Sequence, residues 1–144
     1  MDHRRAGELL GQEVAFRDIR LGVAVDAVLD AALARMIGFD VRCRDEVHRF
    51  LPLAVCTVGR ERITVASALV LMDDAFYRER GRPLAGLRGR TVRHGGREGE
   101  LVDVVVDSGG GVRAYVVTAP RGGEQEIPAS PDVLIAGDAL RPAV

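Results

Sequence analysis

The sequence contains no lysine and no tryptophan, and both absences limit what the protein can be. All 20 basic residues are arginines, and they stand against 21 acidic residues for a formal net charge of −1. This balance excludes a nucleic-acid binder that is basic along its whole length, although it allows a local basic patch. Aromatic residues make up only 4% of the chain, so we expect a core of Val, Leu, Ala and Ile.

Cysteines are also scarce, and long apolar runs are missing. Cys43 and Cys56 are the only two cysteines and form no Cys-x-x-Cys motif, which excludes a disulfide-rich scaffold and fits a reducing compartment. The longest apolar run, Val65–Met72, is interrupted by Ser67 and is far shorter than the about 20 residues of a transmembrane helix. The N-terminal residues carry no apolar signal segment. We therefore expect a cytoplasmic protein with no membrane span.

An internal repeat organises the chain. Three motifs recur in the same order about 77 residues apart: L-x-G-x-x-V at Leu9–Val14 and Leu87–Val92, G-x-x-x-D-x-x-x-D at Gly22–Asp30 and Gly99–Asp107, and an aliphatic residue before proline at Leu51-Pro52 and Ile127-Pro128. We predict two copies of one unit, residues 1–66 and 84–144, joined by a linker of residues 67–83. Within the motifs we expect structural roles for Gly11, Gly22, Asp26, Asp30, Pro52, Gly89, Gly99, Asp103, Asp107 and Pro128.

The second copy has the clearer strand pattern. Glu100–Val106 and Val112–Thr118 are rich in β-branched residues, and the glycines between them predict a hairpin. Strict alternation along the first strand would place Val102, Val104 and Val106 on one face.

In the first copy, helix propensity and the repeat disagree. Ala24–Met36 is rich in Ala and Leu, which favours a helix. The repeat instead predicts a strand over Val23–Leu29, a turn over Asp30–Arg35 and a return strand over Met36–Cys43. We give the repeat precedence because tertiary context overrides propensity.

The linker has a helical pattern over Ser67–Gly81. Leu69, Met72 and Phe76 are spaced as one apolar stripe, and Ser67 is a suitable N-cap. We predict one helix between the copies. Because each copy is small for an independent core, we also expect the copies to pack on each other, or on the helix, as one cooperative unit.

Together these motifs resemble the PRC-barrel family, in a tandem pair. The family pattern is an L-x-G-x-x-V strand, a G-x-x-x-D strand, a hairpin and an Ile/Leu-Pro step before the final strands. The resemblance implies a mainly β fold of two small PRC-type β-barrels, about six strands each, joined by one α-helix.

Members of that family dock to partners rather than catalyse reactions. They include the cytoplasmic domain of the photosynthetic reaction-centre H subunit, the C-terminal domain of the ribosome maturation factor and archaeal division-associated adaptors. The chain departs from the first in having no transmembrane helix. It departs from the second because another PRC-like copy stands where that factor has a different N-terminal domain.

The paired aspartates are better explained by structure than by catalysis. On a strand, Asp26 and Asp30, like Asp103 and Asp107, would lie about 13 Å apart, too far to share a proton. Asp30 and Asp107 also begin turns, where an aspartate caps the backbone. A cation site at these residues is the alternative.

The nucleophile and phosphate motifs are incomplete. Cys43 and His48 could meet as a catalytic pair, but we expect both cysteines to be core thiols. Ser108–Gly111 precedes a predicted strand instead of a helix, and a P-loop would need lysine, so a hairpin tip is favoured over a phosphate cradle. We therefore expect no enzymatic activity, no metal site and no cofactor.

The most informative polar stretch is residues 78–97, which contains seven arginines and a single acid, Glu79, for a net charge of +6. The candidate binding residues are Arg78, Arg80, Arg82, Arg88, Arg90, Arg93, His94 and Arg97. They could form a docking surface for RNA phosphates or an acidic protein face. Alternatively, they could be a solvated loop whose arginines pair with acids such as Glu98 and Glu100.

The favoured function is a non-enzymatic adaptor that binds a protein partner. The alternative is an RNA-associated factor in ribosome assembly or RNA processing that uses residues 78–97. Self-association is a further expectation, since sheet edges can pair between subunits.

Overall fold

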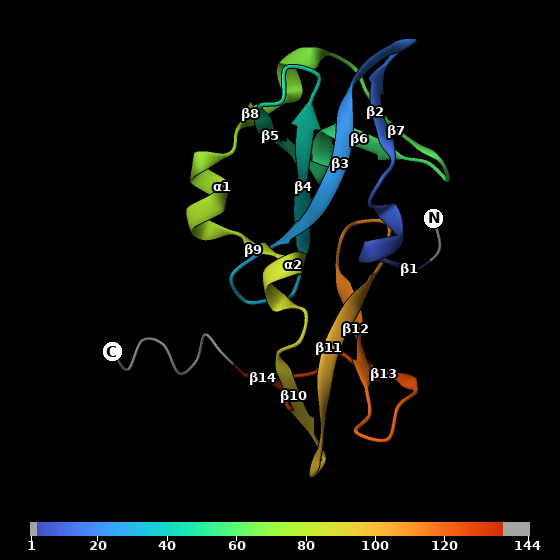
Figure 1. Ribbon diagram of the computed structural model, residues 1–144, viewed down its shortest axis with the longest axis vertical. Coiled ribbons are helices and arrows are strands. Elements are labelled where there is room, and N and C mark those ends of the chain that lie inside the picture. Colours follow the sequence, from blue (N-terminus) through green and yellow to red (C-terminus); the bar gives the residue numbers. More distant parts are fainter. Residues whose placement is uncertain (1–2, 137–144) are drawn as a thin grey trace.

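The chain folds into two sheets that meet in the middle of the molecule (Figure 1). A computed structural model describes residues 3–136, except for the side chains of Phe76 and Arg78. The fold is mainly β, as predicted, and includes a sheet curled into a half-barrel. Residues 137–144 of the predicted second copy lie outside the described residues.

The first sheet has the order β6-β7-β2-β3-β4-β5-β8. Its strands are β2 (Glu13–Phe16), β3 (Ile19–Leu29), β4 (Met36–Cys43), β5 (His48–Pro52), β6 (Cys56–Val58), β7 (Arg62–Val65) and β8 (Met72–Asp73). Only β2 and β7 pair in parallel among the described strands. Three short 3-10 turns accompany these strands: η1 (Ala6–Leu9) precedes β2, η2 (Leu53–Val55) connects β5 to β6, and η3 (Ala68–Val70) connects β7 to β8.

The second sheet has the order β13-β12-β11-β10-β14. Its strands are β10 (Thr91–His94), β11 (Arg97–Val106), β12 (Val112–Thr118), β13 (Glu124–Pro128) and β14 (Leu134–Ile135). Between the sheets run α1 (Ala75–Arg80), β9 (Arg82–Pro83) and α2 (Leu84–Leu87). The pairings among the described residues close neither sheet into a barrel.

The repeat predicted the first copy correctly where helix propensity did not. β3 ends at Leu29, a turn follows, and β4 returns from Met36 to Cys43. Asp30 holds the turn, because its carboxylate accepts hydrogen bonds from the backbone N–H groups of Ala34 (2.9 Å) and Arg35 (3.3 Å). In the second hairpin, Asp107 accepts from Gly109 and Gly111 in the same way.

The predicted face of β11 is correct for Val104 and Val106 and wrong for Val102, because the strand is irregular. The register shifts between Leu101 and Asp103 and again before Val106. The first shift reverses the alternation of side chains between Leu101 and Val104. Val104 and Val106 therefore join the main core with Leu101, whereas Val102 packs on a separate small cluster. β3 has bulges at the equivalent places.

The linker is not the single helix that its pattern predicts. Met72 and Asp73 form β8, which pairs with β5, and only Ala75–Arg80 is α-helical. The Asp73 carboxylate accepts a hydrogen bond from the Ala75 N–H (2.8 Å), which favours a helix start here rather than at Ser67. Ser67 does cap, but it caps the short turn η3. The predicted stripe is consequently absent, and the Leu69 side chain is 91% exposed.

The likeness of the copies extends to Arg82 and Pro83, at the end of the predicted linker. Counted with these two residues, each copy contributes a short strand to the other copy's sheet. β1 (Arg4–Arg5) pairs with β11 of the second sheet, and β9 pairs with β3 of the first. β1 and β9 are equivalent positions in the repeat, since Arg4 lies 78 residues before Arg82. The two copies therefore exchange their first strands.

Asp103 and Asp26 reinforce this exchange. The Asp103 carboxylate accepts hydrogen bonds from the Gly7 N–H (2.9 and 3.1 Å), and Asp26 accepts one from the Ala85 N–H (3.2 Å). Each aspartate thus holds the turn that follows the strand from the other copy. The structural roles expected for both residues stay a prediction, which these hydrogen bonds support.

The motif glycines and prolines also lie at matching positions. Gly11 and Gly89 have φ angles of +88° and +89°, which favour glycine, and their N–H groups bind the carbonyls of residues 24 and 101. A Cβ at Gly22 or Gly99 would approach a backbone oxygen of the return strand to 2.5 Å or less. Across the strand pairs, Pro52 stands opposite Gly38 and Pro128 stands opposite Ala114.

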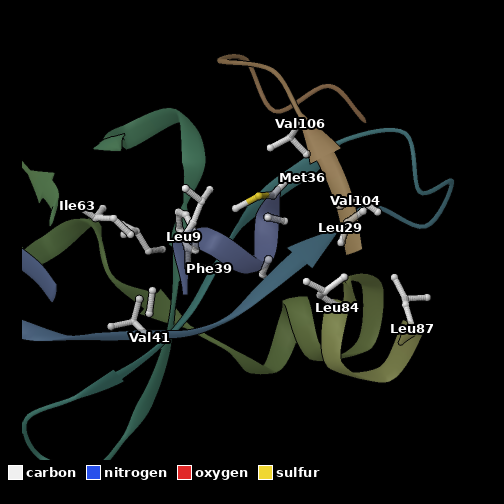
Figure 2. Close-up of a cluster of buried hydrophobic side chains, with 14 of the residues drawn as sticks. Leu9, Leu29, Met36, Phe39, Val41, Ile63, Leu84, Leu87, Val104 and Val106 are labelled. Carbon is white, nitrogen blue, oxygen red and sulfur yellow. The ribbon is translucent and has the colours of Figure 1, made fainter. Parts of the chain in front are cut away.

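One hydrophobic core spans both copies, as predicted. Leu9, Leu29 and Met36 of the first copy belong to the same buried cluster as Leu84 and Val104 (Figure 2). The hairpin tips also touch, since the Met36 N–H donates to the Gly110 carbonyl (2.7 Å) and the Val112 N–H donates to the Ala34 carbonyl (2.9 Å). Cooperative unfolding of the two copies stays a prediction.

Candidate functional site

The arginines of residues 78–97 are distributed along the molecule. Arg80 ends α1, Arg82 is in β9, Arg88 and Arg90 follow α2, and Arg93, His94 and Arg97 lie in the hairpin between β10 and β11. The Arg78 side chain lies outside the described residues.

Several of these arginines have partners within the chain. The Arg88 Nε donates to the Val102 carbonyl (2.9 Å), and its guanidinium is 4.0 Å from the Asp103 carboxylate. The Arg90 Nε donates to the Gly86 carbonyl (3.0 Å). Arg93 forms an ion pair with Glu98 at 2.8 Å. The pairing expected of a solvated loop is therefore present at Arg93.

Two groups of the predicted residues do come together. Arg82 and Arg90 line a pocket of about 220 Å³ beside Tyr115 and Ile135. Arg93, His94 and Arg97 line a shallow depression of about 460 Å³ at the tip of the β10–β11 hairpin, together with other residues that include Glu98 and Asp132. Neither opening is lined by Arg80 or Arg88. The sequence indicated that residues 78–97 are basic, but it did not show that their arginines lie at two separate openings.

The cysteines lack the environment of catalytic nucleophiles. Cys43 is buried and its Sγ contacts the Val41 carbonyl, while the His48 Nδ1 lies 2.9 Å from an Asp40 oxygen. Cys56 is half-buried, and burial raises the pKa of its thiol to about 11. At neutral pH this thiol carries its proton and is a poor nucleophile.

A small acidic pocket was not foreseen from the sequence. Asp26, Asp40 and Asp74 line a cavity of about 110 Å³ next to Phe50 and Tyr77, whose rings stack at 3.5 Å. Burial raises the pKa of Asp26, and hydrogen bonds from Ala85 and Ala27 partly offset that rise. Within residues 3–136 no three His, Cys, Asp or Glu side chains are grouped closely enough to hold a metal ion.

The sequence also missed an apolar groove at the outer end of the first sheet. Its floor and rim include Ile19, Leu21, Leu69 and Leu71, and its volume is about 440 Å³. Ile19 is 54% exposed and Leu69 is 91% exposed. The only sequence signal was Ile19 itself, an isoleucine beside a turn and between charged residues.

None of the helices in the described part of the chain has the length and apolar character needed to cross a membrane. Compared with known proteins, the chain matches no family model and no curated protein.

Proposed function

We propose that this protein is a non-enzymatic docking protein that binds a protein partner. The observation that carries the proposal is the exposure of large apolar side chains at the outer end of the first sheet. Ile19 and Leu69 line one groove there, and Val47 in the nearby β4–β5 turn is 48% exposed. Apolar groups gathered on a surface in this way are typical of interaction sites.

The proposal includes a PRC-type architecture, with each copy a small barrel related to that family. Its support is the set of equivalent positions that the two copies share, above all the positive-φ glycines Gly11 and Gly89 and the aspartates Asp26 and Asp103. A cytoplasmic location belongs to the same proposal, and the two free thiols, Cys43 and Cys56, are in keeping with it.

The test is affinity capture of the tagged full chain from its native cells, with mass spectrometry of the captured proteins. We expect a protein partner whose capture is saturable, is competed by untagged chain and persists after nuclease treatment. If no protein is captured saturably, the proposed function is wrong.

A second candidate function is supported by the basic hairpin. Arg93, His94 and Arg97 gather in one depression, so an RNA-associated role in ribosome assembly or RNA processing remains a proposal. It predicts RNA binding that weakens steeply with salt and is reduced by Arg93→Glu with Arg97→Glu. Arg121→Glu, in the exposed turn before β13, is the control. If no salt-sensitive RNA binding is measured at low ionic strength, this candidate is excluded.

A further inference from the structure

The groove at the outer end of the first sheet is built from three separate segments. Ile19 and Leu21 come from the start of β3, Leu69 comes from η3, and Arg44 comes from the β4–β5 turn. The Arg44 N–H donates to the Leu21 carbonyl (3.2 Å), which ties the turn to the strand. The groove is therefore formed by the tertiary structure, from segments that are distant in the sequence.

Leu69 is held outward by the local structure. The Ser67 hydroxyl accepts a hydrogen bond from the Leu69 N–H (3.1 Å) and fixes the turn η3. The next two residues, Val70 and Leu71, pack against the main core. These contacts anchor η3 without Leu69, whose side chain is left 91% exposed. Packing of the core therefore does not explain why this position is a leucine.

The groove is rimmed mainly by positive charge. Three arginines line it, Arg20, Arg44 and Arg49, against one carboxylate, Asp45. Arg49 and Asp45 neutralise each other through two hydrogen bonds, of 3.0 and 2.9 Å. Arg20 lies 3.9 Å from Glu13, which has a closer partner in Arg62 at 3.0 Å. Arg44 makes no ion pair with any residue that the structure describes.

These observations define what would fit the groove. An occupant must cover Ile19 and Leu69 with apolar side chains and meet Arg20 and Arg44 with carboxylates. A hollow of about 440 Å³ suits side chains that project from a peptide better than it suits a flat surface.

We propose that this groove, formed by β3, η3 and the β4–β5 turn, binds an amphipathic acidic peptide segment of the protein partner. The inference rests on the proposed docking function and specifies its surface. The apolar side chains of the segment cover Ile19 and Leu69, and its Asp or Glu residues pair with Arg20 and Arg44.

The test begins with a library of short random peptides displayed on phage and selected on the immobilised full chain. We expect enriched peptides in which Asp or Glu alternates with Leu, Ile or Phe. Fluorescence anisotropy should show that Leu69→Asp weakens their binding at least about tenfold, as expected for a central apolar contact. Leu134→Asp is the matched control, because Leu134 is an exposed leucine of the second copy, and it should leave binding unchanged.

Charge is tested in the same assay. Arg44→Glu should weaken the selected peptides, whereas Arg121→Glu should not. Enrichment of basic peptides, failure to enrich any peptide, or equal binding by the wild type and Leu69→Asp overturns the proposal.

Two further measurements address other occupants. If the wild type sediments as a dimer and Leu69→Asp as a monomer, the groove holds a second copy. If the wild type floats with phosphatidylglycerol vesicles and Leu69→Asp does not, the groove binds a membrane surface. Either result overturns the proposal.

Affinity capture separates this inference from the docking function itself. Loss of the captured partner in Leu69→Asp supports both. A partner captured equally by Leu69→Asp overturns the groove proposal and leaves the docking function standing. If the wild type captures no partner saturably, the docking function is wrong, and the groove proposal that rests on it is wrong as well.

Discussion

In the first copy, the turn between β2 and β3 leads into an exposed isoleucine, Ile19, whereas the equivalent turn between β10 and β11 contains Gly95 and Gly96 beside Arg97. The first of these outer ends is an apolar groove, and the second is a shallow polar depression. Where the two sheets meet, by contrast, the copies match closely. Their bulges, their positive-φ glycines and their aspartates lie at equivalent positions. The shared residues hold the fold together, and the residues that differ give the two outer ends different surfaces.

The largest effect is expected from separating the copies. We expect residues 1–81 and residues 82–144, expressed apart, each to lack a cooperative thermal transition by circular dichroism, because each loses an exchanged strand and half of the common core. Mixing the two halves should restore the transition. If either half alone unfolds as sharply as the whole chain, the two copies are independent units.

The next effect compares the two aspartates at the exchanged strands. Asp103 is 6% exposed and binds the N–H groups of Gly7 and Val104, whereas Asp26 is only half-buried. We expect Asp103→Ala to lower the free energy of unfolding by about 3 kcal/mol and Asp26→Ala by about 1 kcal/mol. Urea unfolding measures both, with the exposed Asp18→Ala as control. Equal losses of unfolding free energy would mean that the Asp103 and Asp26 contacts with the other copy contribute equally to stability.

A smaller and symmetric effect is expected at the motif glycines. Gly11→Ala and Gly89→Ala should each lower the free energy of unfolding by about 1 kcal/mol, because both positions have positive φ. A Cβ at either position would meet no atom within 4 Å, so backbone strain is the expected cause of both losses. A loss at one glycine and none at the other would contradict the structural equivalence of the copies.

The smallest effect is the pH dependence of stability that Asp26 contributes. Burial raises the pKa of Asp26 in the folded chain, so the folded state gains more protons than the unfolded state as the pH falls toward the ordinary carboxyl range. The contribution of this group to stability therefore increases as the pH falls. Asn at this position can still accept the hydrogen bonds from Ala27 and Ala85, which both reach Oδ1.

Asp26→Asn should consequently be slightly more stable than the wild type at neutral pH, and the difference should shrink in mild acid. Urea unfolding at the two pH values measures it. A difference that widens in acid would show that the hydrogen bonds outweigh burial at Asp26.

The sequence predicted the parts of this molecule that repeat. The turn over Asp30–Arg35 followed from its likeness to the glycine-rich turn of the second copy, although its own residues favour a helix. The face of Val102 could not be predicted, because a bulge leaves no mark in the order of Val102, Val104 and Val106.

The surfaces were harder to predict than the fold. Leu69 lies at helical spacing from Met72, so the sequence favours a helix. In the structure Met72 instead belongs to β8, which pairs with β5, and Leu69 is exposed. The exchange of first strands was equally hidden. Spacing along the chain predicted a structural role for Asp103, but it could not show that the partner of Asp103 is Gly7, 96 residues earlier.

The exchange of β1 and β9 makes the two copies unequal during synthesis on the ribosome. When β11 emerges, its neighbour β1 has already been made, so that edge of the second sheet can be paired at once. The first sheet emerges earlier, but its partner for Val28 and Leu29 is not translated until Arg82 and Pro83. A nascent chain halted before Arg82 would therefore expose an unpaired strand edge, the kind of surface at which incomplete chains aggregate.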